Sequence, residues 1–506
     1  MKAGEIDDIL VLSSYEIGKG ILAKYDYRVI MEWKSCKQIG RFNMKQICNL
    51  MQSWSMDDQG LHSMNEILDW VEERNRTVQV RIDKTILEPD GFWYYSEETG
   101  KIQNRNQSFF SISGFQEMAE EKICLQQPII LQNEIGYLGI LCKQIHGVLH
   151  LLMQAKIEPG NINKIQISPT IQATKSNFTQ KHGGNKPPYL DYFIHAEKYR
   201  IIYDQIQSEQ SSRFYKKRNR NIMIEVGPDT EIEVLPSHKW MTLGQIKALM
   251  NIENLVNMDT RTVLSGIPFT TGDFNEQEKK AIRSCFRDLA LYESMYGVRQ
   301  ENQLPKIYRY MNDYKMFDER ERTLIPLKAL QDWDFTEEEI VCRYPYDFKV
   351  VFCDIEMEGR EVKQWTQPLF EATGIAMFGL FMSRGERREF LVHAKPEVGC
   401  FDLIELGPTV QAEPTRIDQM GNDVERIFRQ KLEQKQGILK DVLLSEEGGR
   451  FYHEQNRNVI IEIDRDELDD LPPGYFWVDF YTLNQLIQIN NCLNIQLRNL
   501  LSLLDR

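Results

Sequence analysis

A lysine and a glutamate two residues apart form a pair that is suited to acid–base chemistry. They are Lys156 and Glu158 in the segment QAKIEPGN. Side chains two residues apart on a β-strand share one face, so the ammonium and the carboxylate are close enough to pair. In a pocket the carboxylate would take a proton and the ammonium would stabilise an oxyanion. A structural ion pair beside the turn at Pro159-Gly160 is the alternative, and the residues alone leave both open.

Amides and hydroxyls are concentrated in the residues that follow this pair. A sugar pocket needs many fixed donors and acceptors, because each sugar hydroxyl exchanges its hydrogen bonds with water for bonds with the protein. Turn formation by Asn and Ser is the alternative explanation for part of the set. The candidate binding residues are Asn161, Asn163, Gln166, Ser168, Thr170, Gln172, Thr174, Ser176 and Asn177.

A histidine in the next segment is a candidate acid or base. His182 precedes two glycines in TQKHGGNKPPY, residues 179–189. Imidazole titrates close to neutral pH, so a histidine on a loop can transfer protons there. A solvated histidine without a catalytic role is the alternative. Tyr189 is a weaker candidate of the same kind.

Arginines are the candidates for binding an anionic group. The run RFYKKRNR contains Arg213 and Arg220, and arginine binds phosphate oxygens in a bidentate way, which suits a pyrophosphate. A solvated charged face is the alternative. The segment NMDTRTVL adds Arg261, for which an ion pair with Asp259 is a further possibility.

The chain is one unit written twice. Residues 154–173 align without a gap to residues 393–412, and 9 of 20 positions are identical. Residues 213–226 align to residues 450–463 with 8 of 14 positions identical. The second copy lacks most of the amides of the first. We therefore expect a duplication whose copies have different roles, with the active pocket in the first copy.

Both copies have the same order of predicted elements. Apolar helical patches at 42–54 and 324–335 precede strands with alternating or β-branched patterns, such as 77–82, 109–114, 137–142 and 148–157. Amphipathic helices at 242–256 and 482–495 end the copies. This order predicts an α/β fold with mixed sheets. The expected boundaries are 1–269 for the first unit, 270–306 for a connecting helical segment and 307–506 for the second unit.

Composition limits the class of protein. The chain has 506 residues, with 61 Lys and Arg against 75 Asp and Glu, which gives a net charge of −14. An acidic chain is poorly suited to binding nucleic acid or an anionic membrane. Nine cysteines without a C-x-x-C pair, no signal peptide and no long apolar run predict a soluble cytoplasmic protein.

Known cofactor motifs are absent from the sequence. It contains no G-x-G-x-x-G after a strand, no G-x-x-x-x-G-K-[ST], no H-E-x-x-H and no G-x-S-x-G. We therefore expect chemistry without a cofactor and without a required metal ion.

Three motifs carry a resemblance to a known family. The run from QAKIEPGNINKIQISPTIQATKSNFTQKHGG to PYLDYF, then RFYKKRNRNIMIEV, then NMDTRTVLSGIPF, resembles the nucleoside-diphosphate-hexose 2,3-dehydratases of deoxysugar biosynthesis. The segment IQNRNQSFF departs from the family pattern, because Asn104 stands where a histidine is usual. The Nudix box is absent from both units, as is usual for these dehydratases.

The resemblance implies a fold, a substrate and partners. It implies two tandem units similar to Nudix hydrolases, a homodimer, and two nucleotide-sugar pockets per subunit, one of them a remnant. The implied substrate is dTDP-4-keto-6-deoxyglucose. Loss of the C3 proton and of the C2 hydroxyl gives a 3,4-diketo-2,6-dideoxy sugar, which a 3-ketoreductase then consumes.

The roles that follow are hypotheses. Glu158 is the expected base, Lys156 the expected oxyanion stabiliser and His182 the expected acid. The alternatives are a Nudix-like nucleotide-sugar hydrolase, which would need a divalent metal, and a non-catalytic nucleotide-sugar-binding protein.

Overall fold

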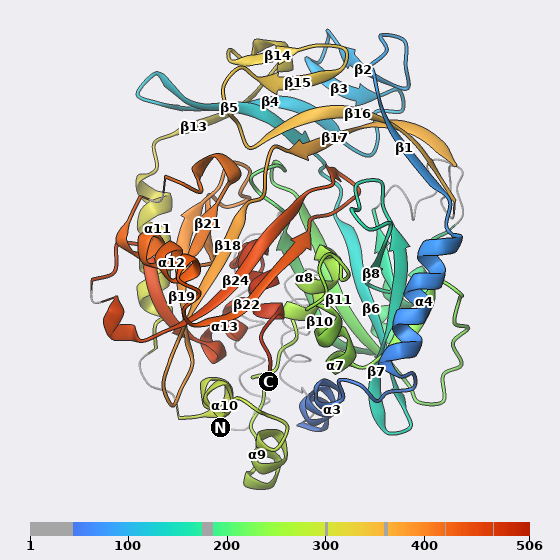
Figure 1. Cartoon of the computed structure of the whole chain (residues 1–506), viewed down its shortest axis with the longest axis vertical. Coiled ribbons are helices and arrows are strands. Elements are labelled where there is room, and N and C mark those ends of the chain that lie inside the picture. The colour runs from blue at the N-terminus through green and yellow to red at the C-terminus, as the bar shows by residue number, and fades with distance from the viewer. Residues whose placement is uncertain (1–43, 175–185, 299–301, 359–362, 420, 469) are drawn as a thin grey trace, which may run out of the picture.

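The protein is described by a computed structural model. It covers residues 44–174, 186–298, 302–358, 363–419, 421–468 and 470–506. Figure 1 shows two large sheets side by side, the first in teal and green and the second in orange and red, below a lobe of smaller sheets. The fold is mixed α/β with two similar halves, as the sequence predicts.

The large sheet of the first unit has seven strands. Its order is β10-β11-β6-β7-β12, with β8 paired to β7 and β9 paired to β6. Only the β11–β6 pairing among these is parallel. The strands are β6 (Gly136–Ile145), β7 (Val148–Ile157), β8 (Ile165–Ser168), β9 (Ile171–Ala173), β10 (Arg200–Ser208), β11 (Arg218–Val226) and β12 (His238–Met241).

The large sheet of the second unit repeats these pairings strand for strand. Its order is β20-β19-β18-β24-β22, with β21 paired to β18 and β25 paired to β19. The β18–β24 pairing is again the parallel one. This confirms the duplication. The strands are β18 (Met377–Ser383), β19 (Glu389–Pro396), β20 (Ile404–Gly407), β21 (Val410–Ala412), β22 (Ile438–Ser445), β24 (Gln455–Ile463) and β25 (Tyr475–Asp479).

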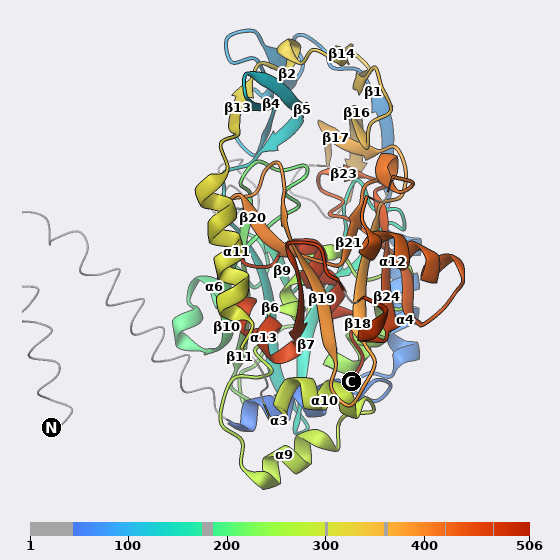
Figure 2. The same cartoon turned by 90° about the vertical axis from the view of Figure 1, so that its left-hand side faces the viewer.

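Four pairs of helices recur at matching positions. They are α3 (Met44–Ser55) with α10 (Leu289–Tyr296), α4 (Met64–Thr77) with α11 (Leu304–Phe317), α7 (Leu243–Leu249) with α13 (Phe480–Leu486), and α8 (Met258–Ser265) with α14 (Ile495–Ser502). Helix α4 packs on β8 and α11 on β20, on opposite sides of the molecule (Figure 2). The remaining helices are α6 (Leu190–Ile194), α9 (Glu276–Arg283), α12 (Asp423–Glu433) and the short η2 (Ala196–Lys198), η3 (Leu327–Ala329), η4 (Pro414–Arg416) and η5 (Arg465–Glu467).

The two smaller sheets exchange a strand between the units. Strand β1 follows α4 of the first unit but pairs with β16 of the second, while β13 follows α11 of the second unit and pairs with β4 of the first. The units are therefore interleaved in space. The strands are β1 (Val80–Thr85), β2 (Trp93–Ser96), β3 (Lys101–Asn104), β4 (Ser111–Ala119), β5 (Lys122–Leu131), β13 (Glu321–Ile325), β14 (Trp333–Phe335), β15 (Glu339–Cys342), β16 (Phe348–Met357), β17 (Gln364–Ala372) and β23 (Phe451–Tyr452).

One prediction about the elements is wrong. Residues 324–335 do not form a helical patch but the end of β13, the short η3 and strand β14. The apolar residues Leu327, Leu330 and Trp333 are all buried in one core cluster that the smaller sheets share. Their spacing of three residues resembles a helical stripe, yet it comes from a chain that turns over the edge of a sheet.

Two glycines join the units by close backbone contact. The Gly160 amide donates to Gly448 O at 2.7 Å, and the Gly399 amide donates to Ser211 O at 2.8 Å. A Cβ atom at Gly160 would overlap the carbonyl oxygen of Phe451, and one at Gly399 would overlap that of Phe214. Each unit's turn thus lies against a loop of the other unit, and only glycine fits there.

Gly160→Ala is therefore expected to destabilise the protein. A side chain forced into packed backbone typically costs about 1–3 kcal/mol, so thermal unfolding should begin several degrees lower. Gly421→Ala is the control, because a Cβ atom there meets no atom within 4 Å. Equal melting temperatures for the two variants would contradict the packing described here.

Candidate active site

The Lys156–Glu158 pair lies at the end of β7, where the strand leaves the core. Ala155 and Ile157 are buried in the apolar core, and Lys156 between them points to the other face. Lys156 Nζ donates to Glu158 Oε1 at 3.0 Å, and the two side chains are only 10% and 4% exposed. The pairing predicted from the strand period is confirmed.

Gln172 holds the Glu158 carboxylate from the adjacent strand β9. Its Nε2 donates to Glu158 Oε1 at 3.0 Å. The Gln172 amide oxygen accepts from Ser168 Oγ at 3.3 Å and from Asn257 Nδ2 at 3.5 Å, which turns the NH₂ group toward Glu158. Two donors therefore meet on one carboxylate oxygen, an arrangement that favours the ionised form. An ionised, fixed carboxylate is what a general base requires.

The second unit contributes to this site. Gln166 Nε2 donates to Ser445 Oγ at 2.6 Å, at the end of β22. Gly448 and Gly449 follow, and a Cβ atom at Gly449 would lie 3.7 Å from Glu158 Oε1. The site around Lys156 and Glu158 is thus completed by Ser445, Gly448 and Gly449 of the same chain.

Buried carboxyl groups surround the pair. Burial and the nearby carboxylate of Glu447 raise the pKa of Glu209 to about 7. Burial, followed by Glu209 and Glu447, raises the pKa of Asp259 well above its usual value. One oxygen of each of Glu209 and Asp259 is buried without a hydrogen-bond partner among the described residues. Several acids that share one low-dielectric space cannot all ionise, so some keep a proton at neutral pH.

Lys217 is the second buried cation here. Its ammonium donates to Glu134 O, and burial lowers its pKa to about 8. The sequence patterns place Lys217 in a charged run and Asp259 in a possible ion pair with Arg261, and they give no indication of Glu209 or Glu447. A comparison of the two copies could have singled out two of these residues, because Lys217 aligns with Glu454 and Asp259 aligns with Gln496.

The second unit has a related but altered constellation. Gln411 Nε2 donates to Glu397 Oε1 at 2.7 Å, as Gln172 does to Glu158. Lys395, however, donates to the backbone oxygen of Gln411 at 2.9 Å and, within the described part of the chain, forms no ion pair with Glu397. The pair of the first unit is therefore not reproduced in the second.

Glu405 shows how one position differs between the pockets. It is fully buried, and Ser208 Oγ donates to its Oε2 at 2.7 Å. In the first unit the corresponding contact is Gln166 with Ser445. Burial raises the pKa of Glu405 to about 7. The free energy of unfolding therefore decreases as pH rises from 4.5 to about 7.

Glu405→Gln is expected to stabilise the protein at pH 8 and to change little at pH 5. The amide fits the equivalent place in the first unit and removes a buried charge. The shift in pKa from 4.5 to about 7 corresponds to a gain of about 3 kcal/mol. Melting temperatures of both proteins at the two pH values test this, and a lower value for the variant at pH 8 would contradict it.

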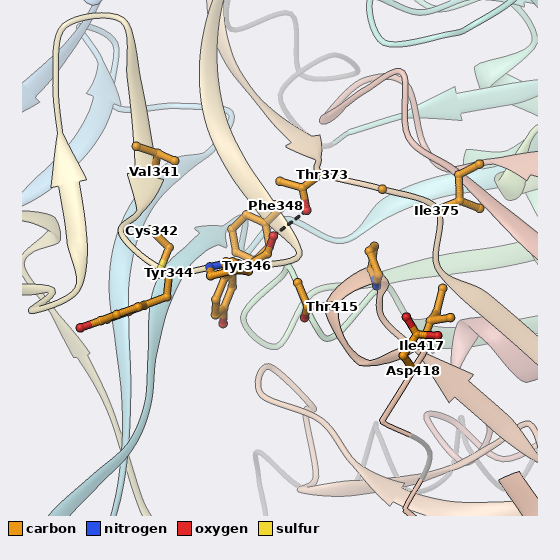
Figure 3. Close-up of a pocket in the computed structure, with 13 residues that line it drawn as sticks. Val341, Cys342, Tyr344, Tyr346, Phe348, Thr373, Ile375, Thr415, Ile417 and Asp418 are labelled. Carbon is orange, nitrogen blue, oxygen red and sulfur yellow. Dashed lines mark hydrogen bonds between the residues drawn. The ribbon is translucent and has the colours of Figure 1, made fainter. Parts of the chain in front are cut away.

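An open pocket of about 530 Å³ lies beside the second constellation (Figure 3). Tyr346 and Phe348 form an aromatic wall, and Thr373 Oγ1 donates to Tyr346 O at 2.5 Å. Thr415, on the other side, donates to Asp347. The volume and the mixture of aromatic and hydroxyl groups suit a nucleoside-sized ligand.

The structure places Arg213 on the side of this second pocket. Its guanidinium lies 4.3 Å from the Phe348 ring and 3.1 Å from a Glu413 oxygen. The counterpart beside the first pocket is Arg450, which lies 4.3 Å from the Phe110 ring and bonds Gln132. The position of Arg213 along the chain predicts that it lies at the first pocket. The sequence does not reveal that the loop carrying Arg213 crosses to the other unit.

Three other expected binding residues have structural partners. Thr170 donates to Leu152 O, and Arg220 forms an ion pair with Asp204. Tyr189 donates to Glu233 O. Corresponding contacts of Thr409 and Arg457 recur in the second unit, which indicates a role in the shared fold.

Arg261 does not pair with Asp259 as considered from the sequence. It is buried, and it donates to Val256 O at 2.6 Å and to Ser445 O at 2.9 Å. Arg498 repeats this in the second unit by donating to Leu493 O and Ser208 O. Each arginine therefore forms a hydrogen bond with the end of a strand of the other unit.

Of the remaining candidates, some lie within the described residues and the others lie outside them. Asn163 accepts from Gln166, and Asn161 donates to Lys164 O and packs on Gly448. Asn104 shapes its own loop by bonding to Ser108. Thr174 ends the described stretch after β9. Ser176, Asn177 and His182 lie outside the described residues.

Comparison with known proteins decides the family. A family model described as NDP-hexose 2,3-dehydratase matches residues 64–267 and, a second time, residues 304–504. The chain belongs to the NDP-hexose 2,3-dehydratase family. Both matches begin at corresponding helices, α4 and α11, so the family model follows the duplication.

Curated relatives of this dehydratase family member cover most of its length. A protein from Saccharopolyspora spinosa is 38% identical over 81% of this chain and 85% of the relative. One from Streptomyces violaceoruber is 36% identical over 88% and 96%. One from Amycolatopsis orientalis is 32% identical over 87% and 90%. Each is named dTDP-4-dehydro-6-deoxy-alpha-D-glucopyranose 2,3-dehydratase.

Two further features of this family member concern the described residues alone. None of its helices there has both the length and the apolar character of a membrane span. No three His, Cys, Asp or Glu side chains in the same residues are grouped as metal ligands would be. The likeness of each unit to Nudix hydrolases stays a prediction.

Proposed function

We propose that the protein is a 2,3-dehydratase of dTDP-4-keto-6-deoxyglucose and that the pocket of the first unit is its active site. The buried Lys156–Glu158 pair, with Gln172 on the same carboxylate oxygen, carries the proposal. Family membership and the names of three relatives support the reaction class.

The reaction needs a base, an oxyanion stabiliser and an acid. The C3 proton of the sugar is acidic because it lies beside the C4 ketone. Glu158 takes this proton, and the Lys156 ammonium stabilises the charge that develops on the C4 oxygen. Loss of the C2 hydroxyl then gives an enol, which tautomerises to the 3,4-diketo-2,6-dideoxy sugar. Water is the only other product, so no electron acceptor is consumed.

Amides of the first pocket are proposed to hold the sugar. Gln166 and Asn161 are buried there, and each has an amide oxygen without a partner among the described residues. A sugar hydroxyl that donates to such an oxygen would recover the cost of its burial. Asn163 and Ser168 complete the polar surface, while His182, Ser176 and Asn177 remain proposals from the sequence.

The proposal also covers the enzyme that uses the product, the oligomeric state and the location. A vicinal diketone is reactive, so a ketoreductase acting at C3 is the class of enzyme that would consume the product. We infer a homodimer from the resemblance stated above and a cytoplasmic location from the composition. The rivals are a Nudix-like hydrolase and a non-catalytic nucleotide-sugar-binding protein.

Incubation with dTDP-4-keto-6-deoxyglucose in heavy water tests the reaction. An aromatic diamine traps a vicinal diketone, and the trapped adduct is expected to carry deuterium at C2. Activity should persist with a chelator present. Release of a nucleoside monophosphate that the chelator stops would establish the hydrolase instead. Unchanged substrate in a sample that binds it would favour the binding protein.

A further inference from the structure

One loop of the second unit carries an acid that its counterpart in the first unit lacks. The loop after β22 reads SEEGGR, residues 445–450, and the loop after β10 reads SEQSSR, residues 208–213. At the compared positions Glu447 replaces Gln210, and two glycines replace two serines. The loops cross, so SEEGGR lies at the first pocket and SEQSSR at the second. The first pocket thus has a carboxyl group where the second has an amide.

The glycines bring Glu447 close to the Lys156–Glu158 pair. A Cβ atom at Gly448 would lie 3.0 Å from Glu158 Cβ, so only glycine allows the loop to approach this far. A Cβ atom at Gly449 would overlap the Glu447 carboxylate while lying 3.7 Å from Glu158 Oε1. Both carboxyl groups therefore lie close to the same point, the position that a Cβ atom of Gly449 would take.

Glu447 is neither locked into the fold nor fully exposed. It is partly buried, and its carboxylate accepts no hydrogen bond from any described residue. The neighbouring acid Glu446 is different, since it is buried and accepts from Asn456 Nδ2 at 2.6 Å. One of these adjacent acids thus serves the fold, and the other is left available to a ligand.

Burial is the main factor that favours a proton on Glu447, and the net effect of its surroundings is a raised pKa. Burial raises its pKa, Arg450 lowers it and the Glu158 carboxylate raises it again. Lys156 and Lys217 act in the lowering direction. Glu158 has two donors on one oxygen, whereas Glu447 has none among the described residues. Of two carboxyls that share a site, the one with hydrogen-bond donors ionises and the other keeps the proton.

We propose that Glu447 is the acid that protonates the departing C2 hydroxyl, opposite Glu158 as the base. This rests on the function proposed above. The C3–H electrons form the C3–C4 enolate while Glu158 receives the proton. The enolate then re-forms the C4 carbonyl, the new double bond joins C2 and C3, and the C2–O bond breaks. The Glu447 proton joins the leaving oxygen as water. Glu158 then loses a proton to solvent and Glu447 regains one.

Glu447→Gln separates the two steps. Its amide has the size of the carboxyl group but cannot supply the proton. We expect dehydration to fall about 100- to 10,000-fold. Exchange of the C3 proton with heavy water should persist, because Glu158 and Lys156 are intact. NMR of the recovered substrate measures this exchange. Retained exchange also shows that the variant is folded and binds the sugar nucleotide.

Glu446→Gln is the matched control and should dehydrate at about the wild-type rate. Dehydration by Glu447→Gln within about threefold of wild type would overturn the proposal. Loss of both exchange and dehydration would also overturn it, because Glu447 would then act before or with the base. A wild-type protein that neither exchanges nor dehydrates would instead remove the proposed function itself.

Discussion

Replacing Glu158 with glutamine is expected to reduce dehydration by about a thousandfold or more. The amide cannot accept the C3 proton, and a positioned base is typically worth about 100- to 10,000-fold. Binding of the nucleotide sugar should change little, because Lys156, Gln172 and the amides remain. Exchange of the C3 proton in heavy water should disappear together with product, unlike in Glu447→Gln.

Glu397→Gln decides which pocket is active. Glu397 accepts from Gln411 as Glu158 accepts from Gln172, so both substitutions alter equivalent positions. We expect turnover to depend on Glu158 and not on Glu397. The reverse result would move the active site to the second unit. Full activity in both variants would remove these carboxylates from the mechanism.

Arg498→Ala is expected to destabilise the protein by about 3–5 kcal/mol or to prevent folding. Arg498 is 1% exposed and donates to Leu493 O, Ser208 O and Thr262 Oγ1. Its removal leaves buried acceptors unpaired and takes a cation away from Glu209 and Glu405, a combination that costs several kcal/mol. Thermal or urea unfolding measures the loss.

Arg81→Ala is the control for this substitution. Arg81 contacts three carboxylates across β1 and β16, including Glu356 at 3.3 Å, but its side chain is 49% exposed. Exposed ion pairs contribute little to stability because water screens them, so the change should be small. A comparable loss of stability in the two variants would contradict the view that burial sets the contribution of each arginine.

Patterns within single segments were sufficient for much of the fold and for the central pair. The two-residue period of β7 places Lys156 beside Glu158, and this requires nothing beyond the strand itself. The cap of α8 is local too, because Asn257 accepts from the Thr260 amide at 2.8 Å. Identity between the copies was enough to predict the duplication that the matched sheets confirm.

The residues that form each pocket depend on how the two units pack against each other. Arg213, read along the chain, belongs with the first unit, yet it contacts Glu413 of the second. Glu447 reaches the first pocket although it lies 289 positions along the chain from Glu158. Arg261 bonds Ser445 rather than its neighbour Asp259.

The physical reason is the range over which sequence patterns act. Periodicity reports which face of one strand or helix is buried, and that information is complete within about ten residues. Strand exchange between β1 and β13 and the crossing of the glycine turns depend on contacts between whole sheets. The sequence by itself therefore determined the repeat and the pairing of Lys156 with Glu158. Only the tertiary structure decided which unit supplies the rest of each pocket.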